Sequence, residues 1–182
     1  MTIKQFLHSK IFRCIVVLLC IALVSGGLLA ILNDLWAVDE AELIQRGVKS
    51  VCSNGEQVVS YKNLSIEYNK GVIQQKILLD SGDYLIKSQG KEGFQKGTVT
   101  VYILAHFENS EYVNITKIAV ADYASSQTLM SKITDAGLAK VAENPNINPG
   151  EIAAGATYSS TAIKNAVNVT LEYIQDGLPE EA

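Results

Sequence analysis

The chain opens with an apolar run that differs from everything after it. From Cys14 to Leu32 there are 19 residues without a charge, which at about 1.5 Å per residue cover most of a hydrocarbon core about 30 Å thick. Basic residues precede this run and acidic residues follow it. The pattern predicts a cytoplasmic N-terminus at 1–13, an uncleaved transmembrane helix at 14–36 and an extracytoplasmic remainder. We therefore expect a single-pass protein of the cell membrane, anchored in the lipid bilayer.

Small residues within this run leave alternatives open. A cleaved signal peptide is the rival interpretation, but Ser25-Gly26-Gly27 lies inside the run rather than after it, where a cleavage site belongs. The same three residues permit close packing against a partner helix in the membrane. The other explanation is a locally flexible helix that faces lipid.

After a predicted juxtamembrane helix and linker at 37–56, the hydrophobic pattern becomes that of a sheet. Short β-rich runs alternate with turn residues such as Asn69-Lys70-Gly71. The predicted strands are Val58–Tyr61, Ser65–Tyr68, Val72–Leu79, Tyr84–Ile86, Thr98–Ile103 and Ile115–Val120. The last two are joined across a polar link at 108–111, which predicts a hairpin.

Two helices are predicted near the C-terminus from apolar residues at helical spacing. The first is expected at 125–143, with Ser125 or Ser126 as its N-cap. The second is expected at 160–176, and Gly177 closes it.

These elements predict an α+β fold: one N-terminal transmembrane helix, then a single domain at 57–182 with a twisted, mostly antiparallel sheet and packed helices. The net charge of −4 over 182 residues argues against nucleic acid as a partner, because binding phosphates needs a basic face. Three cysteines and two histidines show no metal-binding spacing, so no metal is expected. Only Cys52 and His106 could form a Cys–His pair, and ordinary structural roles are favoured for both.

The segment before the last helix carries the candidate chemistry. Thr157 lies just before the predicted helix start, where free N–H groups and the helix dipole favour an anion. Gly155 lets a phosphate approach the backbone closely. Composition alone favours the simpler interpretation, an ordinary Ser/Thr-rich N-cap after a loop.

This segment resembles a known motif. From Gly155 to Val167, Gly-Ala-Thr is followed by Tyr-Ser-Ser and an Ala/Val-rich helix, and this is similar to the flavinylation segment of the FMN-binding domain family. The family pattern is roughly Asp-x-x-Ser/Thr-Gly-Ala-Thr, and its threonine carries FMN through a phosphoester bond. Members include the G subunit of Rnf-type ferredoxin:NAD oxidoreductase complexes and the C subunit of sodium-pumping NADH:quinone reductase. Both resemble this chain in layout, with one N-terminal span and one outer flavodomain.

The resemblance implies a set of cofactor-binding residues: Thr157 as the covalent attachment point, with Gly155, Ala156, Tyr158, Ser159, Ser160, Glu151, Thr128, Leu129 and Met130. Ser159 and Ser160 are the fallback attachment sites, and N–H groups from Tyr158 to Ser160 are expected to hold the phosphate. Lys132 is either a solvated helix residue or a cation that stabilises a reduced, anionic flavin. No catalytic residue is expected on this chain.

Two positions depart from the family pattern. Glu151 stands where the family has Asp, and Ala154 stands where it has Ser or Thr. The upstream family stretch Glu-Thr-Pro-Gly-Leu-Gly is matched here only by Thr128 and Leu129. The seat of the flavin ring is therefore not defined by the sequence.

Three functions follow as hypotheses. The first is an electron-transfer subunit with covalent FMN in an Rnf-type ion-translocating oxidoreductase, matured by a flavin transferase and active only with the other subunits of the membrane redox complex. The second is a stand-alone, membrane-anchored flavoprotein for extracellular electron transfer. The third is a flavin-free anchored structural or binding module, which the departures at Glu151 and Ala154 favour.

Overall fold

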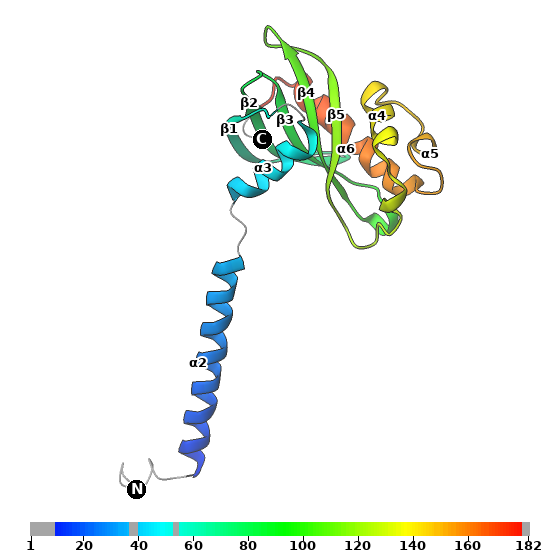
Figure 1. Cartoon of the computed structure of the whole chain (residues 1–182). Helices are drawn as coiled ribbons and strands as arrows, with labels where there is room; N and C mark the ends of the chain where they lie inside the picture. Colours follow the sequence, from blue (N-terminus) through cyan, green and yellow to red (C-terminus); the bar gives the residue numbers. More distant parts are fainter. Residues whose placement is uncertain (1–9, 37–39, 53–54, 180–182) are drawn as a thin grey trace. The chain divides into compact units, whose positions relative to one another are not determined.

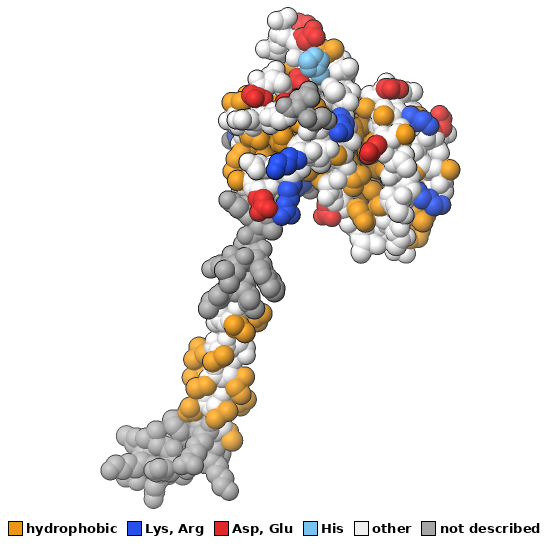
Figure 2. All heavy atoms as spheres, in the orientation of Figure 1, with side chains coloured by type: hydrophobic (Ala, Val, Ile, Leu, Met, Phe, Trp, Pro, Cys, Tyr) orange, Lys and Arg blue, Asp and Glu red, His pale blue; other side chains and the backbone are white. Residues whose placement is uncertain are grey.

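The computed structural model describes the backbone of residues 10–36, 40–52 and 55–179, and the side chains of 14–29, 41–52 and 55–179. The chain divides between Leu43 and Ile44 into two units. The first unit contains a 27-residue helix, α2 (Lys10–Trp36). On the face shown in Figure 2, the described part of α2 carries mainly hydrophobic side chains. Across the described residues, no helix combines the length and the hydropathy needed to cross a membrane.

The second unit is built on a five-stranded antiparallel sheet, which confirms the predicted α+β class (Figure 1). Its strands lie in chain order, each paired with the next. They are β1 (Val58–Tyr68), β2 (Gly71–Leu79), β3 (Tyr84–Gly90), β4 (Val99–Glu108) and β5 (Glu111–Tyr123). The two runs predicted at 58–61 and 65–68 form one strand, with an irregular register between Asn63 and Ile66. The predicted hairpin is confirmed as β4–β5, and it turns at Asn109 and Ser110, both with positive φ.

Helices cover the two faces of this sheet. On β4 the buried side chains alternate: Val101 and Ile103 face the helices of the C-terminal half, whereas Tyr102 and Leu104 pack with α3 (Glu40–Val51). This alternation is expected of a strand buried on both faces. The C-terminal helices are α4 (Asp135–Glu143), α5 (Pro149–Ile152) and α6 (Thr157–Gln175).

Helix α6 lies very close to the sheet. A Cβ at Gly90, the last residue of β3, would overlap the backbone oxygen of Ala162, so only glycine fits there. Deeper along the contact, the buried Ser88 hydroxyl donates to the carbonyl of Ala166 at 2.9 Å. The position of α6, and with it the position of its N-terminus, is therefore determined by the sheet.

The prediction of a helix over 125–143 was wrong at its N-terminal end. Helix α4 begins at Asp135, and its N-cap is Thr134, whose side chain accepts a hydrogen bond from the Gly137 N–H at 3.2 Å. Residues 124–129 form a loop, followed by the short 3₁₀ helix η2 (Met130–Lys132). The Gln127 side chain accepts hydrogen bonds from the Phe94 N–H and the Ser159 hydroxyl and donates one to the Phe94 carbonyl, and these contacts outside the segment favour the loop over a helix.

The predicted end of the second helix is close to the observed one. Gly177 adopts φ +83°, and the N–H groups of Gly177 and Leu178 bond to the carbonyls of Ile174 and Tyr173. This is a Schellman closure, in which a left-handed glycine satisfies the last carbonyls.

Candidate functional site

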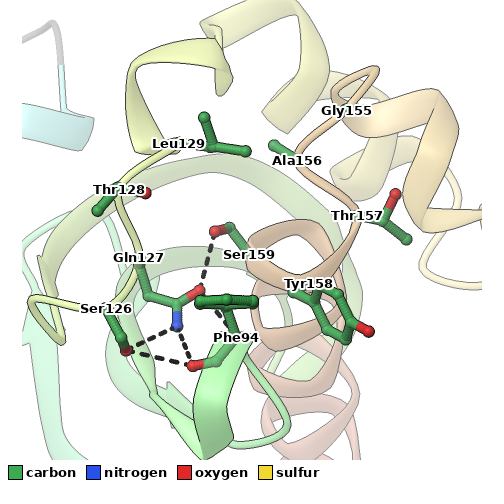
Figure 3. Close-up of a pocket in the computed structure, with 10 residues that line it drawn as sticks. All are labelled: Phe94, Ser126, Gln127, Thr128, Leu129, Gly155, Ala156, Thr157, Tyr158 and Ser159. Atoms are coloured by element: carbon green, nitrogen blue, oxygen red, sulfur yellow. Dashed lines mark hydrogen bonds between the residues drawn. The ribbon is translucent and has the colours of Figure 1, made fainter.

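A pocket of about 100 Å³ lies at the N-terminus of α6 (Figure 3). Three segments distant in sequence line it: the loop between β3 and β4, the loop after β5, and the start of α6. Its residues are Phe94, Ser126, Gln127, Thr128, Leu129, Gly155, Ala156, Thr157, Tyr158 and Ser159. A pocket that encloses a drug-sized ligand holds roughly 300–1,000 Å³. This one is large enough to cover only part of a ligand of that size.

Helix α6 begins at Thr157, three residues earlier than predicted. Gly155 reaches this start with φ +79°, in the left-handed region that glycine tolerates best. The N-cap is Ala156, so no hydroxyl caps the helix. The first i→i−4 bond runs from the Ser160 N–H to the Ala156 carbonyl at 2.9 Å. The N–H groups of residues 157–159 therefore have no intrahelical acceptor and are available to an anion, whereas that of Ser160 is not.

The hydroxyls at this helix start differ sharply in exposure. Thr157 is exposed, and Figure 3 shows its side chain on the outer side of the first turn, away from the Gln127 amide. The Ser159 hydroxyl is buried and donates to Gln127 Oε1 at 2.9 Å. The Ser160 hydroxyl is fully buried, and none of the described residues is its hydrogen-bond partner. Thr157 is thus the accessible hydroxyl of the three candidate attachment sites.

A lysine adds positive charge next to this helix start. Lys132 Nζ lies 2.9 Å from the position that a Cβ at Gly155 would take. The ammonium therefore approaches the backbone where glycine leaves room for it. The helix dipole and the lysine together favour a negatively charged group at this end of α6.

The buried side chain of Gln127 connects the three segments. Its exposed fraction is 1%. Its amide pairs with one residue in both directions, since the Phe94 N–H donates to Oε1 at 3.2 Å and Nε2 donates to the Phe94 carbonyl at 2.9 Å. Ser126 and Ser159 add hydrogen bonds, to the Phe94 carbonyl and to Oε1 respectively. These bonds hold the β3–β4 loop against the start of α6 (Figure 3).

Two glycines make room for this amide. A Cβ at Gly93 would lie 2.9 Å from Gln127 Nε2, and one at Gly97 would overlap the same nitrogen. Between them lies the 3₁₀ segment η1 (Phe94–Lys96), closed by a bond from the Gly93 N–H to the Gly97 carbonyl at 2.9 Å. The part of the loop from Gly93 to Gly97 therefore fits closely around the Gln127 side chain.

The structure brings most of the predicted site residues together. Seven of them line the pocket: Thr128, Leu129, Gly155, Ala156, Thr157, Tyr158 and Ser159. Glu151 lies instead in the first turn of α5, exposed, and Met130 is buried in the core together with Ile163.

Sequence reasoning missed Phe94, Ser126 and Gln127. A lone phenylalanine and a lone glutamine in loops belong to no periodic pattern, so nothing in the sequence indicates that they line a site. The one available signal was the spacing of Gly93 and Gly97 around the phenylalanine.

The Cys52 and His106 side chains have separate partners. Burial, with a hydrogen bond to Glu56, raises the pKa of Cys52 to about 12, so the thiol stays protonated. His106 Nδ1 contacts Asp83 Oδ1 at 2.8 Å, and Nε2 contacts Glu108 Oε1 at 3.4 Å. Neither side chain is arranged for nucleophilic chemistry. Among the residues that the structure describes, no group of three His, Cys, Asp or Glu side chains could hold a metal ion.

No protein-family model matches the chain, and neither a curated protein nor a solved structure matches it significantly.

Proposed function

We propose that this chain is an electron-transfer flavoprotein that carries FMN as a phosphoester on Thr157. The observation that carries the proposal is the exposed threonine at the first position of α6, beside two serines whose hydroxyls are buried. The similarity of the segment from Gly155 to Val167 to a flavinylation motif gives this threonine its chemical role.

The residues present fit a phosphodiester, which carries one negative charge. The N–H groups of residues 157–159 and the Lys132 ammonium would hold it, and Gly155 leaves its approach open. The covalent bond would keep the cofactor at an effective concentration in about the millimolar range or above, so that it is not lost outside the cytoplasm.

The bound flavin would supply the electron-transfer chemistry. The protein would attach it, hold its phosphate and leave part of it accessible to redox partners. Thr157 is then an attachment point, and the complete oxidoreductase activity belongs to the assembly rather than to this chain.

The assembly we propose is an Rnf-type ion-translocating oxidoreductase, with residues 14–36 as a membrane anchor and the second unit outside the cytoplasm. The charge distribution around the apolar run and the layout shared with the Rnf G subunit support this placement. A flavin transferase would install the FMN.

The test is covalent loading of the full chain. The chain is produced in cells together with a flavin transferase and then extracted from their membranes with detergent. The expected product has the mass of the chain plus FMN less one water, and it fluoresces in a denaturing gel. Thr157→Ala is expected to lose both signals completely. Thr161→Ala, which removes a hydroxyl one turn later that donates to the Thr157 carbonyl, should keep them.

Two results would contradict the proposal. One is an unmodified wild-type chain beside a transferase that loads another acceptor in the same cells. The other is a label that survives in Thr157→Ala.

A further inference from the structure

Two aromatic rings are left exposed at the pocket. The exposed fractions of Phe94 and Tyr158 are 45% and 61%, and their ring centroids lie 5.7 Å apart at an interplanar angle of 63°. Leu129, on the same pocket, is 42% exposed. Clustered exposed apolar side chains are uncommon on a soluble surface without a partner or ligand.

The loop that presents Phe94 is strained. Three of its non-glycine residues adopt left-handed backbone conformations: Glu92 at φ 69°, Gln95 at φ 52° and Lys96 at φ 59°. Such conformations cost energy and persist where the surroundings determine them. Two side chains hold the loop here: the Gln127 amide pairs with both backbone groups of Phe94, and Asn165 Nδ2 donates to the Lys91 carbonyl at 3.0 Å and to Glu92 Oε2 at 2.9 Å.

The strained loop and the buried amide do not bring Phe94 into the core, since the residue remains 45% exposed. Their effect is to hold one aromatic side chain at a fixed place beside Tyr158, on the first turn of α6. The adjacent residue, Thr157, lines the same pocket.

We infer that Phe94 and Tyr158 are the seat of a flat heteroaromatic ring, and that Gln127 is the residue that positions this seat. The inference rests on the proposed function, in which the ring is the isoalloxazine of FMN on Thr157. Aromatic rings associate edge-to-face or offset, which the exposed surfaces of this pair permit. Because the pocket covers only part of a ligand, one side of the ring stays open to an electron-transfer partner.

The test uses the full chain loaded with FMN, with loading verified by mass in every variant. Two readouts report the ring: quenching of flavin fluorescence by iodide, and the visible circular dichroism that a fixed ring acquires. In Phe94→Ala the iodide quenching constant is expected to rise about threefold towards that of free FMN, because a ring contact is lost. The visible dichroism should fall by about half or more for the same reason.

Gln127→Leu should produce the same two changes although both rings are present, since the Phe94 loop loses its hydrogen bonds. Tyr61→Ala is the matched control, because Tyr61 is similarly exposed at 47% and lies on β1, outside the pocket. Both of its readouts should equal those of the wild-type chain.

The outcomes separate the two proposals. A wild-type chain without FMN removes the proposed function and this inference together. A loaded wild-type chain whose iodide quenching equals that of free FMN, or a Phe94→Ala variant that matches the wild type, overturns the ring seat alone. A Gln127→Leu variant that melts at lower temperature but keeps both flavin readouts overturns the positioning role.

Discussion

The second unit contains two groups of aromatic side chains that differ in burial. Tyr84, Phe107 and Tyr112 form edge-to-face contacts at centroid distances of 5.1 and 5.9 Å, and all three pack partly buried against a core that includes Ile86 and Ala105. Phe94 and Tyr158 form a similar edge contact at 5.7 Å but remain exposed, at 45% and 61%.

Beside each group lies a buried polar side chain that forms a hydrogen bond with the backbone of one of the aromatic residues. Asp83 accepts the Phe107 N–H at 3.1 Å and contacts His106, whereas Gln127 pairs with both backbone groups of Phe94. In the first group the fastened ring contributes to the core. In the second it is presented to solvent at the pocket, which is the difference expected between a structural cluster and a binding surface.

The two aromatic groups are expected to differ most in what they contribute to stability. We expect Phe107→Ala to lower the free energy of unfolding by about 3 kcal/mol, because a packed aromatic ring is removed from a core. Phe94→Ala should cost less than about 1 kcal/mol, as is usual for an exposed position. Urea unfolding of the two variants measures both values. Equal losses would show that Phe94 is an ordinary core residue and would remove the distinction.

A smaller effect is expected from the amide that supports the pocket. Gln127→Leu should lower the free energy of unfolding by about 2 kcal/mol, since the Phe94 N–H loses its acceptor inside the protein. Gln89→Leu is the matched control, because Gln89 is half-buried and, among the residues that the structure describes, its side chain makes one hydrogen bond, of 3.4 Å to Thr100. The cost of this substitution should be about 0.5 kcal/mol or less. A Gln127 variant as stable as this control would contradict the role given to the amide.

The smallest expected effect is a pH dependence of stability, which should arise beside the Tyr84, Phe107 and Tyr112 group and not beside Phe94 and Tyr158. The hydrogen bond to Asp83, and then that to Glu108, raise the pKa of His106 above its ordinary value. A raised folded pKa stabilises the protein below the unfolded pKa of about 6.5, and this stabilisation is lost as the pH rises through the folded pKa.

Urea midpoints at about pH 5 and about pH 9 measure this pH effect. The decrease from the lower to the higher pH should be smaller in His106→Gln than in the wild type. Gln127→Leu should shift the midpoint equally at both values, because an amide does not titrate. An unchanged pH response in His106→Gln would show that the ion contacts of His106 contribute nothing.

Much of the fold could be predicted from hydrophobic periodicity. The β4–β5 hairpin and α6 have long, regular patterns, and both were found close to the expected ranges. The start of α4 was not predictable in the same way. Serines at 125 and 126 are good N-caps, but the burial of Gln127 and its bonds to Phe94 favour a loop there, which is a tertiary effect that local sequence does not express.

In the candidate site, too, the local features were predicted and the tertiary contacts were not. The helix start around Thr157 was predicted because glycine, hydroxyl residues and a following apolar helix are contiguous in sequence. The opposite wall was missed because Phe94 and Gln127 are 33 positions apart and meet only through the fold. Exposure was missing too: sequence left Thr157, Ser159 and Ser160 as alternatives, and burial separates them.

Peptide mapping of the chain purified from its native membranes would decide whether Thr157 carries FMN. The segment from Glu151 to Lys164 should carry the mass of FMN less one water, with fragmentation placing it on Thr157. An unmodified peptide from membranes with active redox complexes would contradict the account and leave a flavin-free anchored module as the better explanation.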